Sequence, residues 1–420
     1  MKTTTRKAQA FPMVKQAIIK MQALTMLTVV MLVTLTLTSA PLPEADNLNT
    51  TAHAQRERVM LYVNNQLLVK LSAEAQAKPF AQRYGLTLKR HIKANLHLFE
   101  IAAADVTSVE DLVAHVKRDR DVIWAEPNYL AKLDQNTDQL PDPSVDQRHV
   151  PRVSDRLPSE HLRQYAITQV KGEQAHHYST GAGTWVAVID TGADESHPAI
   201  RQVIQPGWDF VSDDDDPSES GHGSSYGHGT AIASVIHLIA PDATLVAYRA
   251  FNADGLGTAA DIASAIYDAV DYYWVDVINA GFSIPVDSST LSEAIEYARQ
   301  RGVVLIASAG NAAERAARYP AIYAGVIGVA ATDSTDRRAP FSNYGAGVDV
   351  AAPGVNIHGA YPGNRWARWS GTSLATALVS GQAALILAEG RSIDVMSRTA
   401  DPVVDTELRA GRINCLRALQ

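Results

Sequence analysis

Three residues of this sequence, each in a glycine-containing segment, carry the side chains that acyl transfer requires. Asp190 follows the apolar run VAVI, His228 lies in YGHGTAIAS, and Ser373 lies in SGTSLATAL. Acyl transfer uses a hydroxyl as the nucleophile, an imidazole that takes its proton, and a buried carboxylate that orients the imidazole. The chain therefore offers one candidate for each role, in the order Asp, His, Ser.

Each candidate has a simpler interpretation when it is considered alone. Asp190 begins Asp-Thr-Gly, which has the composition of a turn. His228 would be a metal ligand together with His222, but the glycine-rich spacing fits no helical or hairpin metal motif. Ser373 would be a helix cap. The occurrence of all three in one chain order favours a catalytic triad instead.

At these residues the chain resembles the subtilisin family of serine peptidases, most closely its thermitase-like branch. The resemblance runs from about Gln164 to the C-terminus. It implies a fourth catalytic residue, Asn311 in IASAGNAA, whose amide would stabilise the oxyanion of the tetrahedral intermediate. It also implies that the reaction requires no cofactor and that the substrates are polypeptides.

By motif match, the resemblance further implies that the substrate lies extended between two strand edges. The residues expected on these edges are Gly255, Gly257, Gly281 and Ser283. The sequence departs from the family here, because AGFSI replaces the usual Ser-Leu-Gly-Gly and Leu256 is bulkier than the residue commonly found there. ATALVSG likewise replaces ATPHVAG after the nucleophile, and TAIAS replaces THVAG after His228. These departures affect specificity and efficiency rather than reaction type.

The resemblance places Arg318, just before Tyr319-Pro320, at the floor of the primary specificity pocket. That pocket holds the side chain on the acyl side of the scissile bond. A guanidinium there would pair with an Asp or Glu side chain of the substrate. The alternative is that Arg318 turns to solvent or pairs with Glu314, which leaves a broad apolar pocket.

The segments that must position these residues alternate between predicted strands and helices over residues 164–420. This alternation predicts an α/β domain whose parallel sheet is covered by helices on both faces, and the resemblance identifies it as subtilisin-like. We expect Asp190 to end a strand, and His228 and Ser373 to begin helices. A nucleotide-binding alternative rests on Gly181 and Gly183, but these precede a strand, whereas a phosphate loop follows one.

Residues 55–133 read as a small α+β domain. The pattern predicts a first strand with a turn at Asn64-Asn65, a helix that ends at Gly85, a second strand LHLFEIA, a helix capped by Ser108, and a last strand VIWAEPNYLA. The order of elements, and EPNY (residues 126–129) in particular, is similar to the inhibitory propeptide of subtilisin-like peptidases. The alternative is an independent binding domain.

Residues 134–163 contain four prolines among polar residues without periodicity, which predicts a linker. The resemblance implies that the chain cleaves itself in this region to release the mature domain, residues 164–420. The sequence does not indicate which bond is cut.

Residues 1–54 have the order of a secretory signal peptide: a basic run, an apolar stretch at 23–37, and a polar segment with prolines. Ala52-His53-Ala54 is a small-x-small site, which predicts cleavage before Gln55. The alternative is an uncleaved membrane anchor. The apolar stretch is shorter than the ~20 residues that a spanning helix needs, which favours a secreted, extracellular protein.

The composition is that of a globular chain: 420 residues, 46% apolar and 20% charged, with a net charge of −8. We expect no nucleic-acid partner, because the net charge gives no basic surface. We also expect a monomer. The single cysteine, Cys415, excludes an intrachain disulfide.

An acidic loop, WDFVSDDDDPSES, resembles a thermitase-like calcium loop at Asp209, Asp214 and Asp216. A solvated acidic loop is the alternative, and the sequence alone favours it, so we assign no metal-ligating residue.

Together, the residues and the resemblance predict a secreted serine endopeptidase that acts through an acyl-enzyme and is made as a zymogen inhibited by its own propeptide. Two alternatives remain at this stage. One is a catalytically impaired peptidase fold that serves for binding, which the intact Asp190, His228, Ser373 and Asn311 argue against. The other is a membrane-tethered processing protease, if the Ala54–Gln55 bond is not cut.

Overall fold

The computed structural model of the chain describes residues 61–101, 108–134, 153–154, 159–405, 407–408 and 411–420. The predicted signal peptide, residues 1–54, lies outside these ranges. Among the described residues, no helix has both the length and the apolar character needed to cross a membrane.

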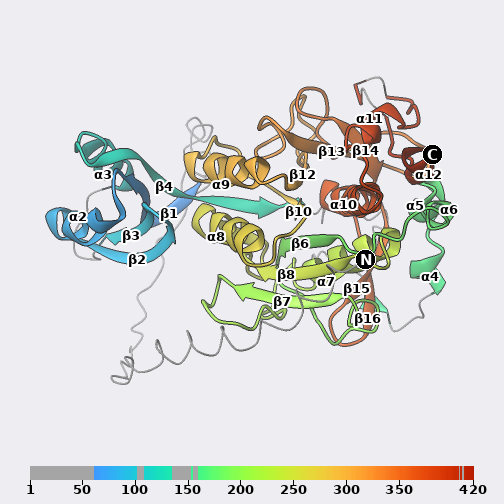
Figure 1. Cartoon of the computed structure of the whole chain (residues 1–420), viewed down its shortest axis with the longest axis horizontal. Helices are drawn as coiled ribbons and strands as arrows, with labels where there is room; N and C mark the ends of the chain where they lie inside the picture. The colour runs from blue at the N-terminus through green and yellow to red at the C-terminus, as the bar shows by residue number, and fades with distance from the viewer. Residues whose placement is uncertain (1–60, 102–107, 135–152, 155–158, 406, 409–410) are drawn as a thin grey trace, which may run out of the picture. The chain divides into compact units, whose positions relative to one another are not determined.

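A seven-stranded parallel sheet forms the centre of the larger domain, in the order β14-β13-β12-β10-β6-β8-β7 (Figure 1). The strands are β6 (Trp185–Asp190), β7 (Ile204–Asp209), β8 (Thr244–Arg249), β10 (Val277–Ala280), β12 (Val304–Ser308), β13 (Val326–Thr332) and β14 (Val350–Pro353). The α/β fold predicted from the sequence is therefore confirmed.

Helices cover both faces of this sheet. They are α7 (His228–Ile239) and α10 (Thr372–Ala388) on one face, and α8 (Ala259–Asp271) and α9 (Ser289–Gln300) on the other (Figure 1). Successive side chains of a strand point to opposite faces. Val186 and Val188 of β6 accordingly pack into the core beneath α7 and α10, whereas Ala187 and Ile189 pack into the core beneath α8 and α9. Burial on both faces explains why β6 is apolar up to its last residue.

Shorter elements complete this domain. They are the strands β9 (Leu256–Thr258) and β11 (Phe282–Ser283), an antiparallel sheet of β15 (Ile357–Tyr361), β16 (Arg365–Trp369) and β5 (Val153–Ser154), and the helices α4 (Ser159–Leu162), α5 (Tyr165–Gln169), α6 (Gly172–Ala175), α11 (Val395–Arg398) and α12 (Cys415–Leu419). Both β5 and α4 fall inside residues 134–163, so part of the predicted linker is ordered, with β5 paired to β16.

The smaller domain is an antiparallel sheet in the order β4-β1-β3-β2 with helices on one face. Its elements are β1 (Tyr62–Leu71), η1 (Glu74–Gln76), α2 (Ala77–Tyr84), β2 (Leu86–Lys93), β3 (Leu96–Ile101), α3 (Val109–Val116) and β4 (Val122–Leu133). Gly85 ends α2 in a left-handed conformation, and the Ser108 hydroxyl caps α3, as predicted. The predicted turn at Asn64-Asn65 is wrong, because both residues lie within β1 at a shift in register. β2 was not predicted.

Alternate residues of β1 attach the small domain to the large one. Leu67 and Val69 belong to the small domain's own core, whereas Leu68 belongs to the core of α8 and α9.

The EPNY segment in β4 adds polar contacts at the starts of the same helices. The Glu126 carboxylate accepts hydrogen bonds from the N–H groups of residues 289 and 290 at 2.8 and 2.9 Å, and Asn128 Oδ1 accepts one from the N–H of Ala260 at 3.1 Å. Helix N-termini favour such acceptors.

The end of β4 continues beyond its own sheet into the large domain. There it pairs antiparallel with β9 on one side and β11 on the other. This pairing positions Leu133, the last residue of β4, and Asp134, the first residue of the predicted linker, beside Gly255, Gly281 and Ser373.

Candidate active site

Asp190 and His228 form a buried hydrogen-bonded pair. Asp190 is the last residue of β6 and His228 the first of α7, as the sequence predicts. The His228 Nδ1 lies 2.8 Å from Asp190 Oδ1 and 3.0 Å from Oδ2. The N–H of Thr191 also donates to Oδ1, at 2.8 Å. The carboxylate is thus held as an acceptor that orients the imidazole.

Ser373 completes the arrangement on the other side of the imidazole. It is the second residue of α10, and its Oγ lies 2.9 Å from His228 Nε2. Asp190, His228 and Ser373 are all fully buried. The tight packing beside the nucleophile favours glycine at position 281, because a Cβ there would lie 3.1 Å from the Ser373 Cβ. The geometry is that of a nucleophile, a base and a group that orients the base.

A buried carboxyl group that the sequence analysis missed, Glu219, links the end of β6 to the start of α7. Its oxygens accept hydrogen bonds from the N–H groups of Gly227 and Thr230 at 2.9 and 3.1 Å, and from the Thr191 hydroxyl at 3.1 Å. Burial raises the pKa of Glu219 to about 8, and the two backbone donors oppose this rise. Glu219 lies at the end of the acidic loop WDFVSDDDDPSES, where the sequence analysis considered only the aspartates as calcium ligands.

Asn311 lies beside the first turn of α10. Its Oδ1 accepts hydrogen bonds from the N–H and the hydroxyl of Thr372, at 3.0 and 2.8 Å. This fixes the amide so that Nδ2 is its remaining donor, and among the described residues this buried Nδ2 has no partner. A second asparagine, Asn343, which the sequence analysis missed, holds the loop by accepting from the N–H groups of Ala312 and Glu314.

The end of β4 lies along both predicted substrate edges. The N–H of Leu133 donates to the Gly255 oxygen, and the N–H of Asp134 donates to the Gly281 oxygen, each at 3.0 Å. In the strand register, Ala131 lies opposite Gly257 and Lys132 lies opposite Ser283. The structure therefore brings the four predicted edge residues together around one extended segment of this chain.

Arg318 adopts the contact that the sequence analysis gave as the alternative. Its guanidinium forms two hydrogen bonds with the Glu314 carboxylate, both at 2.9 Å. The Arg318 guanidinium lowers the pKa of Glu314, and the Glu314 carboxylate in turn raises the pKa of Arg318. Polar groups also lie at the predicted pocket, because the Ser283 and Ser308 hydroxyls donate hydrogen bonds to the Asp134 carboxylate.

The departures from the usual family sequence around the nucleophile lie in the core. Ala377 and Leu378 in α10, and Ala231 in α7, are fully buried and belong to the core between these helices and the sheet. Leu256, by contrast, is 41% exposed at the edge that pairs with β4. The first three changes therefore concern helix packing, whereas Leu256 and the altered AGFSI segment lie beside the end of β4.

The acidic loop does not fit a calcium ion at Asp209. Asp209 Oδ2 lies 2.5 Å from Arg249 Nη1, and its Oδ1 accepts from the N–H groups of residues 211 and 212. Asp214 and Asp216 accept hydrogen bonds from the N–H groups two residues further along the chain. Within the described ranges, no cluster of three or more His, Cys, Asp or Glu residues is arranged to hold a metal.

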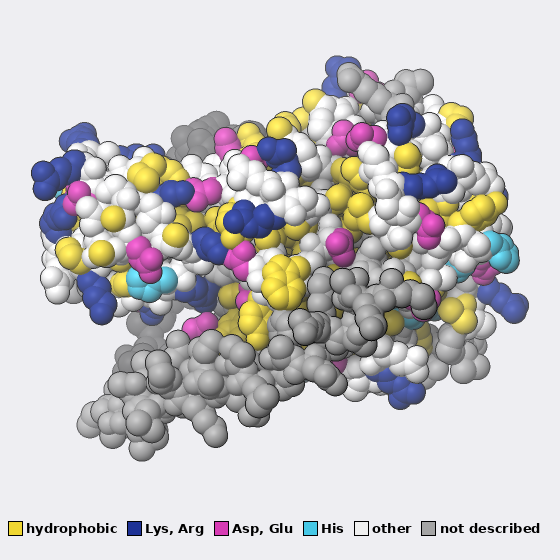
Figure 2. All heavy atoms as spheres, in the orientation of Figure 1, with side chains coloured by type: hydrophobic (Ala, Val, Ile, Leu, Met, Phe, Trp, Pro, Cys, Tyr) yellow, Lys and Arg dark blue, Asp and Glu magenta, His cyan; other side chains and the backbone are white. Residues whose placement is uncertain are grey.

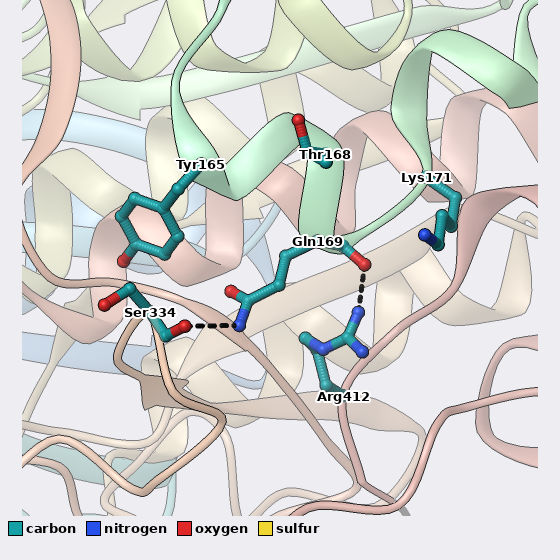
Figure 3. Close-up of a pocket in the computed structure, with 6 residues that line it drawn as sticks. All are labelled: Tyr165, Thr168, Gln169, Lys171, Ser334 and Arg412. Atoms are coloured by element: carbon teal, nitrogen blue, oxygen red, sulfur yellow. Dashed lines mark hydrogen bonds between the residues drawn. The ribbon is translucent and has the colours of Figure 1, made fainter.

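A pocket of about 420 Å³ lies outside the triad (Figure 3). Its lining consists of Tyr165, Thr168, Gln169, Lys171, Ser334 and Arg412. The two dashed contacts in Figure 3 tie Gln169 to Ser334 and to Arg412. Arg412 also forms ion pairs with Asp336 and Asp401, so its charge is already neutralised by these two carboxylates.

Charged side chains are interspersed on the face of the described residues seen in Figure 2. Lys and Arg side chains alternate there with Asp and Glu side chains and do not gather into one basic surface. Burial raises the pKa of the Cys415 thiol to about 12, so this group stays a neutral thiol in the core.

Two family profiles match the chain. That of the Subtilase family covers residues 181–406, and that of the fervidolysin N-terminal prodomain covers residues 49–128. The first match includes all three members of the hydrogen-bonded array, and the second includes β1 and most of β4.

Individual relatives cover much of the chain. Thermitase from Thermoactinomyces vulgaris is 36% identical over 274 residues, which are 61% of this chain and 96% of thermitase. A thermophilic serine proteinase from Bacillus sp. (strain AK1) is 34% identical over 376 residues, 85% of this chain and 88% of the relative. The crystal structure of fervidolysin from Fervidobacterium pennivorans, described as a keratinolytic enzyme related to subtilisin, superposes with a TM-score of 0.70 at 24% identity. That superposition covers 86% of this chain and 62% of fervidolysin, and it shows the fold alone.

Proposed function

Because the chain belongs to the subtilase family of serine endopeptidases and carries a prodomain, we propose that it hydrolyses peptide bonds through Asp190, His228 and Ser373. The observation that carries this proposal is the continuous set of hydrogen bonds from Asp190 through His228 to Ser373, at 2.8 and 2.9 Å.

Each side chain has one role in the proposed reaction. Ser373 Oγ attacks the scissile carbonyl carbon while His228 Nε2 accepts its proton. Asp190 holds Nδ1 protonated and stabilises the imidazolium that forms. His228 then gives the proton to the leaving amine, and an ester between Ser373 and the acyl part of the substrate remains. Water, activated by His228 in the same way, hydrolyses this acyl-enzyme.

The developing oxyanion needs donors that are already aimed at it. We assign this role to the N–H of Ser373 and to the Asn311 amide. Thr372 fixes the Asn311 Oδ1, so Nδ2 is the donor that remains for the oxyanion. An amide suits this role because it donates without losing a proton.

We expect the Asn311→Ala variant to lose about 10²–10³ in kcat with little change in KM, which is the loss known for the corresponding donor of subtilisin. The reason is that the substrate carbonyl gains its charge only in the transition state. Steady-state kinetics on a peptide substrate measure both constants. Asn364→Gly, which removes an exposed amide at a positive φ, is the matched control. A loss of less than threefold in Asn311→Ala would remove Asn311 from the proposed mechanism.

We further propose that the small domain is an intramolecular inhibitor and that the chain is exported as a zymogen. The end of β4 between β9 and β11 supports inhibition, because it lies where an extended substrate would bind. Export rests on the predicted signal peptide and its cleavage before Gln55.

The reaction that we propose uses no cofactor. We assign no calcium ion to the acidic loop, because the Asp209 carboxylate already pairs with Arg249. The altered ATALVSG and AGFSI segments motivated the catalytically impaired alternative. No observation favours it, since Ala377 and Leu378 lie in the core and the AGFSI segment pairs with the end of β4 while the triad hydrogen bonds remain intact.

A further inference from the structure

Asp134 is the residue of this chain that lies against the nucleophile. Its N–H donates to the Gly281 oxygen at 3.0 Å, and its carbonyl oxygen accepts from the N–H of Ser373 at 3.2 Å. The Ser373 N–H is one of the two donors assigned to the oxyanion. The Asp134 carbonyl therefore occupies the position of a scissile carbonyl, and the Asp134 side chain occupies the position of the acyl-side residue.

The Asp134 side chain is enclosed by hydroxyl groups on two strands. Asp134 is 6% exposed. Its Oδ1 accepts from the Ser283 hydroxyl at 2.8 Å, and its Oδ2 accepts from the Ser308 hydroxyl at 2.5 Å. Ser283 belongs to β11 and Ser308 ends β12, so both donors lie in strands of the peptidase domain. Each carboxyl oxygen thus has its own donor from the pocket.

Two cations act on this carboxyl group from a distance. Burial raises the pKa of Asp134 to about 6, while the two serine hydroxyls, Arg318 and Lys132 oppose the rise. Arg318 feels the reciprocal effect, since Asp134 contributes to raising its pKa. The pairing of Arg318 with Glu314 therefore does not remove its influence on the pocket. The two hydroxyls and the two cations thus offset part of the cost of burying a carboxylate in this pocket.

An apolar side chain would bind in this pocket less tightly than a carboxylate. The Ser308 hydroxyl would keep one partner, the Phe282 oxygen at 3.1 Å. The Ser283 hydroxyl, in a residue only 4% exposed, would lose its partner when the pocket closes over a hydrocarbon. A buried polar group without a partner costs binding free energy, so a site built from such groups discriminates against substrates that lack the matching group.

We propose that the primary specificity pocket of this peptidase selects acidic residues through Ser283 and Ser308, and that maturation accordingly cuts the bond between Asp134 and Gln135. This inference rests on the proposed function and names its substrate class. Asp134 is then the acyl-side residue of the bond that is cut in the precursor. It also has the type of side chain that the mature enzyme prefers at this position of its substrates.

The maturation step follows the proposed mechanism atom by atom. Ser373 Oγ bonds to the Asp134 carbonyl carbon, and the hydroxyl proton moves to His228 Nε2. The bond to the Gln135 nitrogen breaks, and that nitrogen takes the proton from His228. Water then adds to the ester, Asp134 leaves with a free α-carboxylate, and Ser373 regains its proton.

A peptide series based on residues 131–137, Ala-Lys-Leu-Xaa-Gln-Asn-Thr, tests the pocket directly with the purified mature enzyme. Xaa is Asp, Glu, Asn, Leu or Phe, and kcat/KM is measured for each peptide. We expect cleavage after Xaa, with Asp at least about tenfold above Leu and Phe. The Ser283→Ala variant should lower kcat/KM for the Asp peptide by about ten- to hundredfold, and it should raise kcat/KM for the Leu peptide, because no hydroxyl is then buried without a partner. Ser334→Ala, at an exposed serine, is the control.

Failure of this inference can be told apart from failure of the proposed function. Faster cleavage of the Leu or Phe peptide than of the Asp peptide would overturn acidic selection and leave a serine peptidase in place. Cleavage of none of the peptides would overturn the proposed function. Mass spectrometry of the prodomain released from the wild-type precursor supplies a second result: a fragment ending at Asp134 is expected, and one ending elsewhere would refute the assigned bond.

Discussion

The Ser373→Ala variant is expected to lose about 10⁶ in kcat, which is the loss known for the nucleophile of subtilisin. It is also expected to accumulate at the size of the precursor. Without the hydroxyl, no group stands 2.9 Å from His228 Nε2 to attack a carbonyl. The same hydroxyl would cut the chain during maturation, so one substitution should abolish both activities. Peptide hydrolysis and the size of the expressed chain on a denaturing gel measure the two effects.

A matched control separates this effect from misfolding. Ser334→Ala should mature and act as the wild type does, because Ser334 is exposed and only its backbone oxygen accepts a bond. Addition of active wild-type enzyme to the Ser373→Ala precursor tests whether the linker is accessible. Processing of the variant when it is expressed without other proteases would show that another group performs the cut.

The Asp190→Asn variant is expected to lose about 10⁴ in kcat while it keeps its fold. Asparagine has nearly the same shape as aspartate, but its amide nitrogen can donate toward His228 Nδ1. The imidazole would then carry its proton on Nε2, facing Ser373, and could no longer act as the base. Kinetics at saturating substrate measure the loss, and circular dichroism checks the fold.

Asp215→Asn is the control for this second substitution, since Asp215 is exposed in the acidic loop. It should leave kcat within twofold of the wild type. A loss of less than tenfold in Asp190→Asn would show that the carboxylate does not set the tautomer of His228, and the role assigned to Asp190 would be withdrawn.

The local features of the fold could be predicted because they depend on short stretches of sequence. The apolar run that ends at Asp190 predicts a strand buried on both faces, and the structure has β6 there. The positions of His228 and Ser373 at helix starts follow from the glycine shortly before each, Gly227 or Gly371, and the apolar residues after it. The predicted turn at Asn64-Asn65 failed, because pairing of β1 with β3 and β4 overrides a local turn preference.

The contents of the specificity pocket could not be predicted, because they depend on residues that are distant in sequence. The pocket joins Asp134 to Ser283 and Ser308, which lie on different strands. The sequence suggested only Arg318 as the charged group of this pocket, and the structure ties it to Glu314. Glu219 was missed for the same reason, since its partners belong to the end of β6 and the start of α7.

The central claim is that Ser373 is a nucleophile activated by His228, and a fluorophosphonate probe measures this most directly. The mature wild-type protein is incubated with the probe, and labelled peptides are identified by mass spectrometry. One label per chain is expected, on Ser373, and the His228→Ala variant should react far more slowly, because the base 2.9 Å from the hydroxyl is gone. A mature protein that cleaves peptides but carries the label on another residue, or carries none, would contradict the assignment.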